Sequence, residues 1–320
     1  MLTDALLSNS RYPLHMPGHK RNPELSPPLS IDFDVTEAEG FDDLYEPTGA
    51  IAEIEALASR IYSSKKSFLL VNGSTCGNLA AIRAACLKTN ASNIALHGIP
   101  HQSVLNAAEL CGLTVVRSTI APVTLVTSPS YEGMVQDVSA IADKVHSYGG
   151  ILIADSAHGA HLGFHPYFPE NATRLGADIV VESLHKTLPA LGQVSLLHVC
   201  GDRIEPELVK RQINVFQTTS PSYLLMQSAE HCLKLLESRS TELFSAFAAR
   251  LKRFYSATGL TPQDDPSKIL IPDHNFAQIL RQNGFEPERV TDDYTLLIMT
   301  ICDPDWVYDR LTTLLKGRVK

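Results

Sequence analysis

The sequence contains no run of 18 apolar residues, and its first twenty residues show neither a basic start nor a long apolar stretch. A membrane-spanning helix and a secretory signal peptide are therefore not expected. There is also no internal repeat and no low-complexity segment. With 320 residues, 44% of them hydrophobic, the chain is long enough to bury a core, and one large domain with a smaller one is expected.

Cysteines are few and scattered, and no two of them form a C-x-x-C pair. They are Cys76, Cys86, Cys111, Cys200, Cys232 and Cys302. This spacing indicates the reducing cytoplasm rather than a disulfide framework or a zinc site. The formal net charge of −8 argues against nucleic acid or an anionic membrane as the main partner. Small-molecule substrates remain open.

Apolar runs of strand length alternate with helical patterns from about residue 50. The apolar runs are 67–71, 93–98, 113–118, 123–128, 150–155 and 178–183, and helical periodicity marks 51–62 and 77–89. This alternation predicts an α/β fold, with a mostly parallel sheet covered by helices on both faces. The run 193–199 follows 178–183 too closely for a helical crossover, so an antiparallel strand is expected there.

The two ends of the chain have different patterns. Residues 1–45 are rich in Pro and Gly and poorly periodic, which predicts an extended arm. A long helical pattern runs from Pro221 to about Ala257, and strand and helix patterns then alternate twice. We therefore expect an N-terminal arm (1–45), a large domain (46–257) and a small C-terminal α+β domain (258–320).

Polar residues follow several of the predicted strands. "NGST" (72–75), His101 and Asp155 end three apolar runs, and Ser183, His185 and Lys186 follow a fourth. Ligands of open α/β sheets bind beyond the carboxyl ends of the strands. The sequence therefore predicts a site at one edge of the sheet.

The stretch "NGSTCGN" (72–78) opens a predicted helix. Gly73 permits a tight turn, and the unpaired backbone N–H groups that follow can bind a phosphate. Ser74 and Thr75 add hydroxyl donors. An ordinary helix N-cap is the alternative interpretation.

Asp155 lies in "ADSAHGAHLGF" (154–164). A buried carboxylate can hold a pyridinium nitrogen protonated, so that the ring accepts electrons. His158 can bond to a ring oxygen or to a substrate carboxylate. A cap or an ion pair would explain Asp155 equally simply, and the two residues without a third ligand are weak support for a metal, so no metal is expected.

Lys186 lies in "SLHKT" (183–187), directly after an apolar run. An amine in this position can form a Schiff base with an aldehyde cofactor, and a sheltered, positive environment would lower its pKa and favour the neutral nucleophile. Lys186 follows Asp155 by 31 residues, which suits one strand-to-strand crossover. A lone lysine belongs on the surface, but the neighbouring residues favour a site.

Five segments resemble the signatures of the Orn/Lys/Arg decarboxylase family. They are "MPGHK" (16–20), "VNGSTCGN" (71–78), "DSAHGAHLGFHP" (155–166), "SLHKTLPALGQVSLLH" (183–198) and "QTTSPSYLLMQS" (217–228). The resemblance runs from about residue 12 to 232, and more weakly to the end, as in a shortened member. It implies a pyridoxal-phosphate enzyme of fold type I, with the aspartate aminotransferase-like fold.

The resemblance also implies a role for each residue of the site. Lys186 would hold the cofactor covalently, Asp155 would pair with the pyridine nitrogen, His101 and Ala157 would cover the two faces of the ring, and His158 would lie near the ring oxygen. Gly73, Ser74, Thr75, Ser183 and His185 would surround the phosphate. Ser220 would reach the site across a dimer interface, because sites of this fold are shared between subunits.

The activity implied by the resemblance is decarboxylation of arginine, lysine or ornithine to the amine and carbon dioxide, by a homodimer or a higher homo-oligomer. An aminotransferase or a carbon–carbon lyase with the same cofactor is an alternative, and a cofactor-binding protein without turnover is another. The acidic segment 32–46 offers carboxylates for a basic substrate, although a solvated loop is the simpler interpretation.

Overall fold

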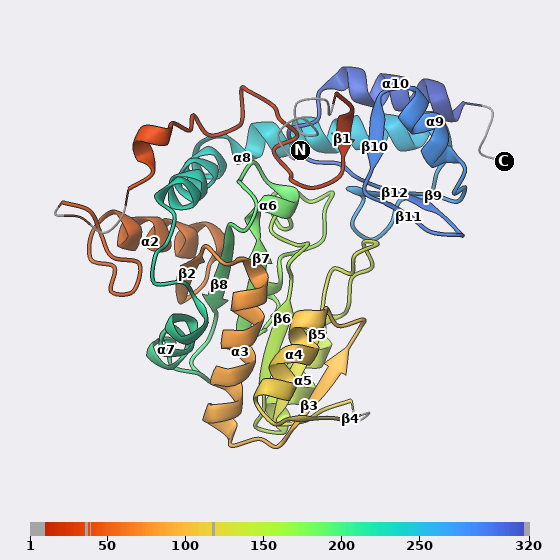
Figure 1. Cartoon of the computed structure of the whole chain (residues 1–320). Coiled ribbons are helices and arrows are strands. Elements are labelled where there is room, and N and C mark those ends of the chain that lie inside the picture. Colours follow the sequence, from red (N-terminus) through yellow and green to blue (C-terminus); the bar gives the residue numbers. More distant parts are fainter. Residues whose placement is uncertain (1–9, 36–37, 39, 117–118, 317–320) are drawn as a thin grey trace.

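The computed structural model describes residues 10–35, 38, 40–116 and 119–316, and within them seven strands form one central sheet (Figure 1). Their spatial order is β2 (Lys66–Leu70), β8 (Ser195–Val199), β7 (Ile179–Ser183), β6 (Ile151–Asp155), β5 (Val123–Thr127), β3 (Asn93–His97) and β4 (Thr114–Val116). β8 is antiparallel to β2 and β7, whereas the pairs from β7 to β4 are parallel. The expected mostly parallel sheet and the antiparallel strand at 193–199 are thus confirmed.

Some predicted segments extend beyond the described residues. These are residues 1–9 of the arm, 36, 37 and 39 of the acidic segment, 117–118 of the strand expected at 113–118, and 317–320 at the C-terminal end.

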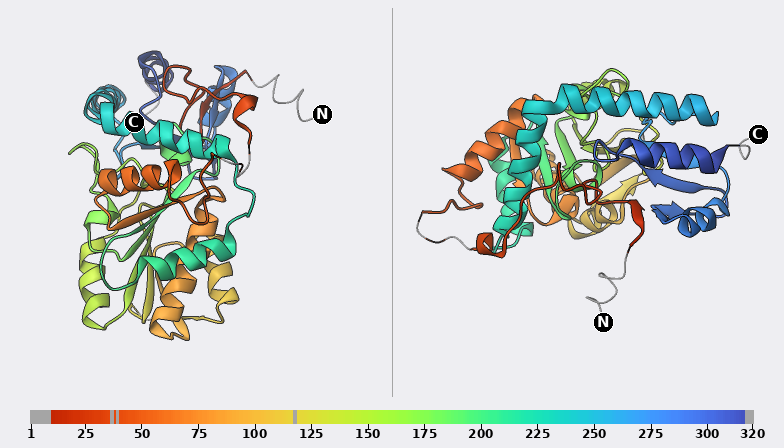
Figure 2. Two further views of the ribbon diagram at one scale, coloured as in Figure 1. Left: turned by 90° about the vertical axis from the view of Figure 1, so that its left-hand side faces the viewer. Right: turned by 90° about the horizontal axis from the view of Figure 1, so that it is seen from above.

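Helices cover both faces of the sheet (Figure 2). α3 (Gly73–Thr89), α4 (Gln102–Leu110) and α7 (Pro206–Phe216) share one apolar cluster with one face, and α5 (Val138–Ser147) packs on the other. Successive residues of β6 point to opposite faces, so Ile153 packs beneath α3 while Leu152 packs beneath α5. Burial on both sides explains why these strands read as continuous apolar runs.

α8 (Tyr223–Thr258) connects the sheet to the C-terminal part of the chain (Figure 1). That part contains the antiparallel sheet β11 (Arg289–Val290), β12 (Thr295–Ile298) and β9 (Lys268–Ile271), with α9 (Phe276–Gln282) and α10 (Asp305–Leu315). One apolar cluster runs from α2 (Ala50–Tyr62) through α8 to α10. The division at residues 257 and 258 stays a prediction, because this core continues across it.

The N-terminal arm joins the C-terminal part. β1 (Tyr12–Leu14) pairs in parallel with β10 (Phe285–Pro287), and further along the arm lies the short 3-10 helix η1 (Ile31–Phe33). The buried Lys20 donates from Nζ to the carbonyl of Ile298 at 2.8 Å. The "MPGHK" segment is therefore anchored by its lysine beneath the small sheet.

No described helix is both long and apolar enough to span a membrane. The six cysteines are free thiols.

Candidate active site

A cavity of about 600 Å³ opens at the carboxyl ends of the parallel strands. The segments after β2, β3, β5, β6 and β7 line it, which is the edge where the sequence predicted a site. Ten of the residues singled out from the sequence lie on its wall: Gly73, Ser74, Thr75, His101, Asp155, Ala157, His158, Ser183, His185 and Lys186. These ten residues come from the ends of four strands, β2, β3, β6 and β7, and from the segments that follow them, and they meet around one space.

Ser220 is not on this wall. It is exposed, and its N–H donates to the Thr218 hydroxyl at 3.2 Å. Thr218 in turn donates its N–H to the side-chain oxygen of Asn72, which does line the cavity, at 2.9 Å. The segment therefore lies near the cavity mouth, and the role of Ser220 across a dimer interface stays a prediction.

The start of α3 forms one end of the cavity. Asn72 precedes the helix and makes no side-chain capping bond with the described chain, because its oxygen accepts from Thr218 instead. The Ser74 hydroxyl lies 2.7 Å from that of Ser183. Gly77 lets α3 approach the sheet closely, since a Cβ there would lie 2.6 Å from a methyl of Val181. The Gly73 N–H donates to the Gln193 carbonyl at 2.9 Å, but the helix start has no side-chain cap, and together with the two hydroxyls it suits an anion.

Asp155 is buried and held by two hydrogen bonds. Its Oδ2 accepts from the Asn78 amide at 3.0 Å, and its Oδ1 accepts from the N–H of Ala157 at 3.2 Å. Asn78 also donates to the Ser103 hydroxyl at 2.9 Å. That hydroxyl lies 2.8 Å from His101 Nδ1, so it donates its proton to the ring. The carboxylate and the imidazole across the cavity are thus linked through Asn78 and Ser103, two residues for which the local sequence carries no signal.

Lys186 lies beside His158, with 3.1 Å between Nζ and Nε2. Burial lowers the pKa of the Lys186 amine, and the carboxylates of Asp155 and Glu288 oppose this shift only in part. Burial and the neighbouring lysine charges hold the pKa of His158 well below its ordinary value. His158 is therefore a neutral imidazole at physiological pH.

Lys268 is a site residue that was not predicted from the sequence. It belongs to β9 of the C-terminal part, is fully buried, and places its Nζ 3.5 Å from His158 Nδ1. In the sequence it begins an ordinary strand, "KILI", more than a hundred residues after His158.

The mouth of the cavity is lined by the loop after β5 and by β11. Arg289 lies 3.9 Å from the Glu132 carboxylate, which also accepts from the Tyr294 hydroxyl at 2.9 Å. Tyr131 sets its ring edge against His158 and donates its hydroxyl to Glu288. The C-terminal part therefore closes the cavity on one side.

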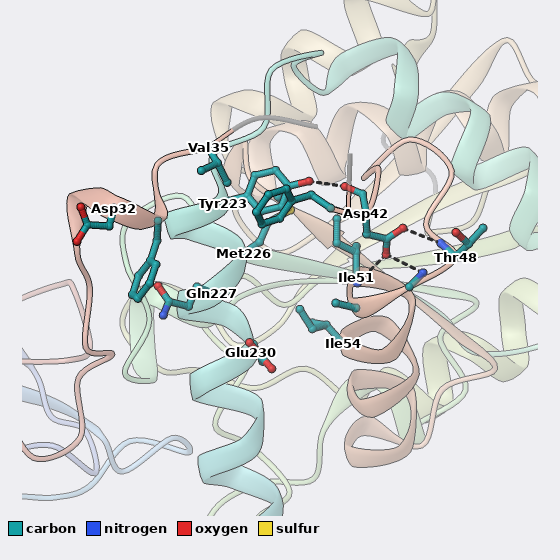
Figure 3. Close-up of a pocket in the computed structure, with 15 residues that line it drawn as sticks. Asp32, Val35, Asp42, Thr48, Ile51, Ile54, Tyr223, Met226, Gln227 and Glu230 are labelled. Atoms are coloured by element: carbon teal, nitrogen blue, oxygen red, sulfur yellow. Dashed lines mark hydrogen bonds between the residues drawn. The ribbon is translucent and has the colours of Figure 1, made fainter. Parts of the chain in front are cut away.

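A second hollow, of about 490 Å³, lies between the arm and the starts of α2 and α8 (Figure 3). Here Asp42 caps α2, accepting from the N–H groups of Gly49 and Ile51 at 3.0 and 2.8 Å. Six residues of the acidic segment line this hollow, and none of its described residues lies on the wall of the larger cavity. Nor does the described chain contain a group of three or more His, Cys, Asp or Glu residues arranged to hold a metal.

The chain matches the family model described as "Orn/Lys/Arg decarboxylase, major domain" over residues 26–119 and 113–247. Among curated proteins it is 32% identical to the uncharacterized protein YaaO of Bacillus subtilis, over 85% of this chain and 65% of that protein. It is 30% identical to an arginine decarboxylase of Bacillus cereus, over 76% of this chain and 60% of the relative. The chain thus spans between half and two thirds of the length of these relatives.

Solved structures share the fold. The constitutive lysine decarboxylase of Escherichia coli superposes with a TM-score of 0.72 at 18% identity, covering 85% of this chain and 51% of the other. A putative L-allo-threonine aldolase of Listeria monocytogenes superposes with a TM-score of 0.70 at 16% identity, covering 97% of both chains. Since the family model covers most of the chain, this protein belongs to the Orn/Lys/Arg decarboxylase family.

Proposed function

We propose that this protein is a pyridoxal-phosphate-dependent decarboxylase of a basic amino acid, releasing the amine and carbon dioxide. The observation that carries the proposal is the position of the Lys186 amine, partly buried, with a lowered pKa, on the wall of the cavity that Asp155 also lines. Family membership and the names of the relatives, arginine and lysine decarboxylases, support it.

The cavity fits each chemical part of the proposed cofactor. The uncapped start of α3, with Ser74, Thr75, Ser183 and His185, suits the phosphate. Asp155, buried and hydrogen-bonded as a carboxylate, suits a protonated ring nitrogen. His101 and Ala157, which both line the cavity, are the residues that we propose for the two faces of the ring.

When bound, pyridoxal phosphate supplies an aldehyde that holds the amino acid and a ring that takes up the electron pair left by carbon dioxide. Asn78 and the Ala157 N–H, which both donate to Asp155, hold this carboxylate in place on the cavity wall. Lys186 Nζ, with His158 Nε2 at 3.1 Å, is the group that moves a proton to the substrate Cα. Protonation at this carbon separates decarboxylation from transamination.

Glu132 is the residue that we propose for the basic tail of the substrate. Apart from Asp155, it is the other carboxylate among the described residues on the cavity wall. A guanidinium or ammonium tail requires an acidic or carbonyl-rich partner. Arginine, lysine and ornithine are all compatible with this arrangement.

The proposal includes a homodimer or higher homo-oligomer with shared sites, acting in the cytoplasm. Thr219 and Ser220, the exposed residues of the "TTSPSY" segment (218–223) next to Asn72, support shared sites. The six free thiols support a reducing compartment.

The test is a single assay of the purified chain with pyridoxal phosphate against arginine, lysine and ornithine. We expect carbon dioxide and the matching amine in equal amounts, and neither with Lys186→Ala. Two parallel assays separate the alternatives. With an α-keto acid added as amino-group acceptor, a new keto acid without the decarboxylated amine would show an aminotransferase; with a hydroxyamino acid as substrate, release of an aldehyde would show a carbon–carbon lyase. Cofactor binding without any product would show a protein without turnover.

A further inference from the structure

Three basic side chains form a row beside the cavity, and two of them, Lys186 and His158, line it. The His158 ring lies between two lysine amines, with Lys186 Nζ 3.1 Å from Nε2 and Lys268 Nζ at a longer 3.5 Å from Nδ1. Lys186 comes from the segment after β7 and Lys268 from the C-terminal part. The row therefore connects the amine of Lys186, which follows a strand of the large sheet, to the amine of Lys268, which lies in the small sheet.

The position of Lys268 leaves its amine little freedom. Its side chain is fully buried, and a Cβ on Gly133 would lie 2.9 Å from Lys268 Cβ and Cγ, so the loop after β5 packs directly on the stem. The edge-on ring of Tyr131 holds His158 from another side. The contacts of the row are thus imposed by packing.

Counting protons restricts what this row can hold. A neutral imidazole carries one N–H, so one ring nitrogen donates and the other accepts. An ammonium group donates only. A neutral amine can both donate and accept, so both contacts of His158 are satisfied only when at least one lysine is neutral, and the row holds at most one ammonium. When the row is charged, one lysine is therefore an ammonium and the other is a neutral amine.

Two such arrangements exist. In one, Lys186 is the ammonium and donates to Nε2, while Nδ1–H donates to the neutral Lys268. In the other, Nε2–H donates to the neutral Lys186, while the Lys268 ammonium donates to Nδ1. They interconvert when a proton moves from Lys186 Nζ to Nε2 and another moves from Nδ1 to Lys268 Nζ.

We propose that Lys186, His158 and Lys268 share a single mobile positive charge, so that Lys268 is the positioning residue that receives the Lys186 proton through His158. Lys186 becomes a neutral nucleophile without releasing a proton to water, and recovers the proton when it acts as an acid. The proton count is unchanged by the exchange, and no other reactant is needed.

The surrounding charges are consistent with one charge in the row. The groups that face it are Lys20 from the arm, Asp155, His161 and His185 from the large part, and Asp265 and Glu288 from the C-terminal part. Burial, the largest cause, lowers the pKa of Lys268 to about 8 against the opposing effect of Asp265, and burial lowers the pKa of Lys186 as well. Two neighbouring amines of this kind titrate as a coupled pair.

The inference rests on the proposed function only in treating Lys186 as the reacting amine, and its test needs no turnover. ¹⁵N NMR of the histidine rings in the full chain free of cofactor reports which nitrogen of His158 carries the proton, with His158→Gln identifying the signal. In the native chain we expect both ring nitrogens at values between those of N–H and bare nitrogen near neutral pH. A single fixed tautomer from pH 6 to 9 would overturn the proposal.

Two substitutions at Lys268 should move the proton in opposite directions. Lys268→Arg keeps a permanent donor facing Nδ1, so the proton should stay on Nε2. Lys268→Met removes the group facing Nδ1, so the Lys186 ammonium should hold the proton on Nδ1. The same tautomer in both folded variants would refute a shared charge, and the native spectrum decides the matter if a variant does not fold.

The reactivity of Lys186 gives a second readout. Acetic anhydride in a limiting amount labels neutral amines, and the extent of labelling is quantified at the Lys186 peptide. In the native chain this extent should change less than about twofold as the pH rises from the first to the second titration step of the Lys186–Lys268 pair. In Lys268→Met it should rise about tenfold per pH unit until Lys186 is neutral, as for an isolated amine. A rise of the same slope in the native chain would contradict the sharing of one charge, whatever the outcome of the decarboxylase assay.

Discussion

Gly18 of the N-terminal arm donates its N–H to the carbonyl of His185 at 2.7 Å, one residue before Lys186. A Cβ on Gly18 would lie 2.6 Å from the backbone nitrogen of Leu188. The arm thus lies directly on the short helix that carries the reacting lysine.

Gly18→Ala should loosen this contact and with it the position of Lys186. Because the clash is with backbone, we expect a loss of about 1–3 kcal/mol in the free energy of unfolding and weaker cofactor binding. Thermal unfolding and cofactor titration measure the two effects. Gly192→Ala is the matched control, since nothing lies within 4 Å of its added Cβ; equal behaviour of the two variants would remove the arm from this role.

Lys186 should bind the cofactor covalently. The purified protein should absorb near the boundary of the visible and ultraviolet, and borohydride should attach the cofactor irreversibly to one peptide. Mass spectrometry identifies that peptide. A labelled peptide without Lys186, such as one containing Lys268, would show that the reacting amine is misassigned.

Asp155→Asn should keep part of its cofactor affinity but lose most turnover. A neutral amide cannot hold the ring nitrogen protonated, and losing one strong electrostatic interaction lowers kcat by about 10²–10³. Steady-state kinetics at saturating cofactor measure this effect. Near-normal kcat in a folded Asp155→Asn protein would exclude the role proposed for this carboxylate.

Glu132→Gln should weaken the binding of basic substrates. Losing a hydrogen bond between charged groups corresponds to a fall of about 10- to 100-fold in kcat/KM, mostly through KM. Tyr294→Phe is a milder control, because it removes the hydroxyl that donates to Glu132 and leaves the charge. Unchanged KM values for arginine, lysine and ornithine would show that another group binds the tail.

Mixed dimers test whether sites are shared. One subunit carries Lys186→Ala and the other a disrupted Ser220 segment, so each parent homodimer is inactive. If sites are shared, the mixed dimer regains one site with intact residues from both chains, and part of the activity returns. A fully active monomer in light scattering, or no recovery in verified mixed dimers, would support a self-contained cavity.

Much of the site could be predicted from the sequence, because the burial of a strand is visible in the residues of that strand itself. Burial on both faces makes each central strand a continuous apolar run, and the polar residues after such runs must lie at one edge of the sheet. Asp155, His158 and Lys186 were found in this way. Their roles came from the family resemblance, since the pattern alone left a cap, an ion pair and a surface lysine open.

The tertiary structure alone decided which distant residues complete the cavity. Asn78 and Ser103 link Asp155 to His101 because α3 and α4 pack together over the sheet. Lys268 reaches His158 because β9 comes from a part of the chain that folds back over the cavity. Such contacts depend on the packing of whole elements, so no spacing in the sequence predicts them. The sequence by itself determined which segments form strands, helices and the reactive edge; the packing of the arm and the C-terminal part against that edge determined which amine faces which imidazole.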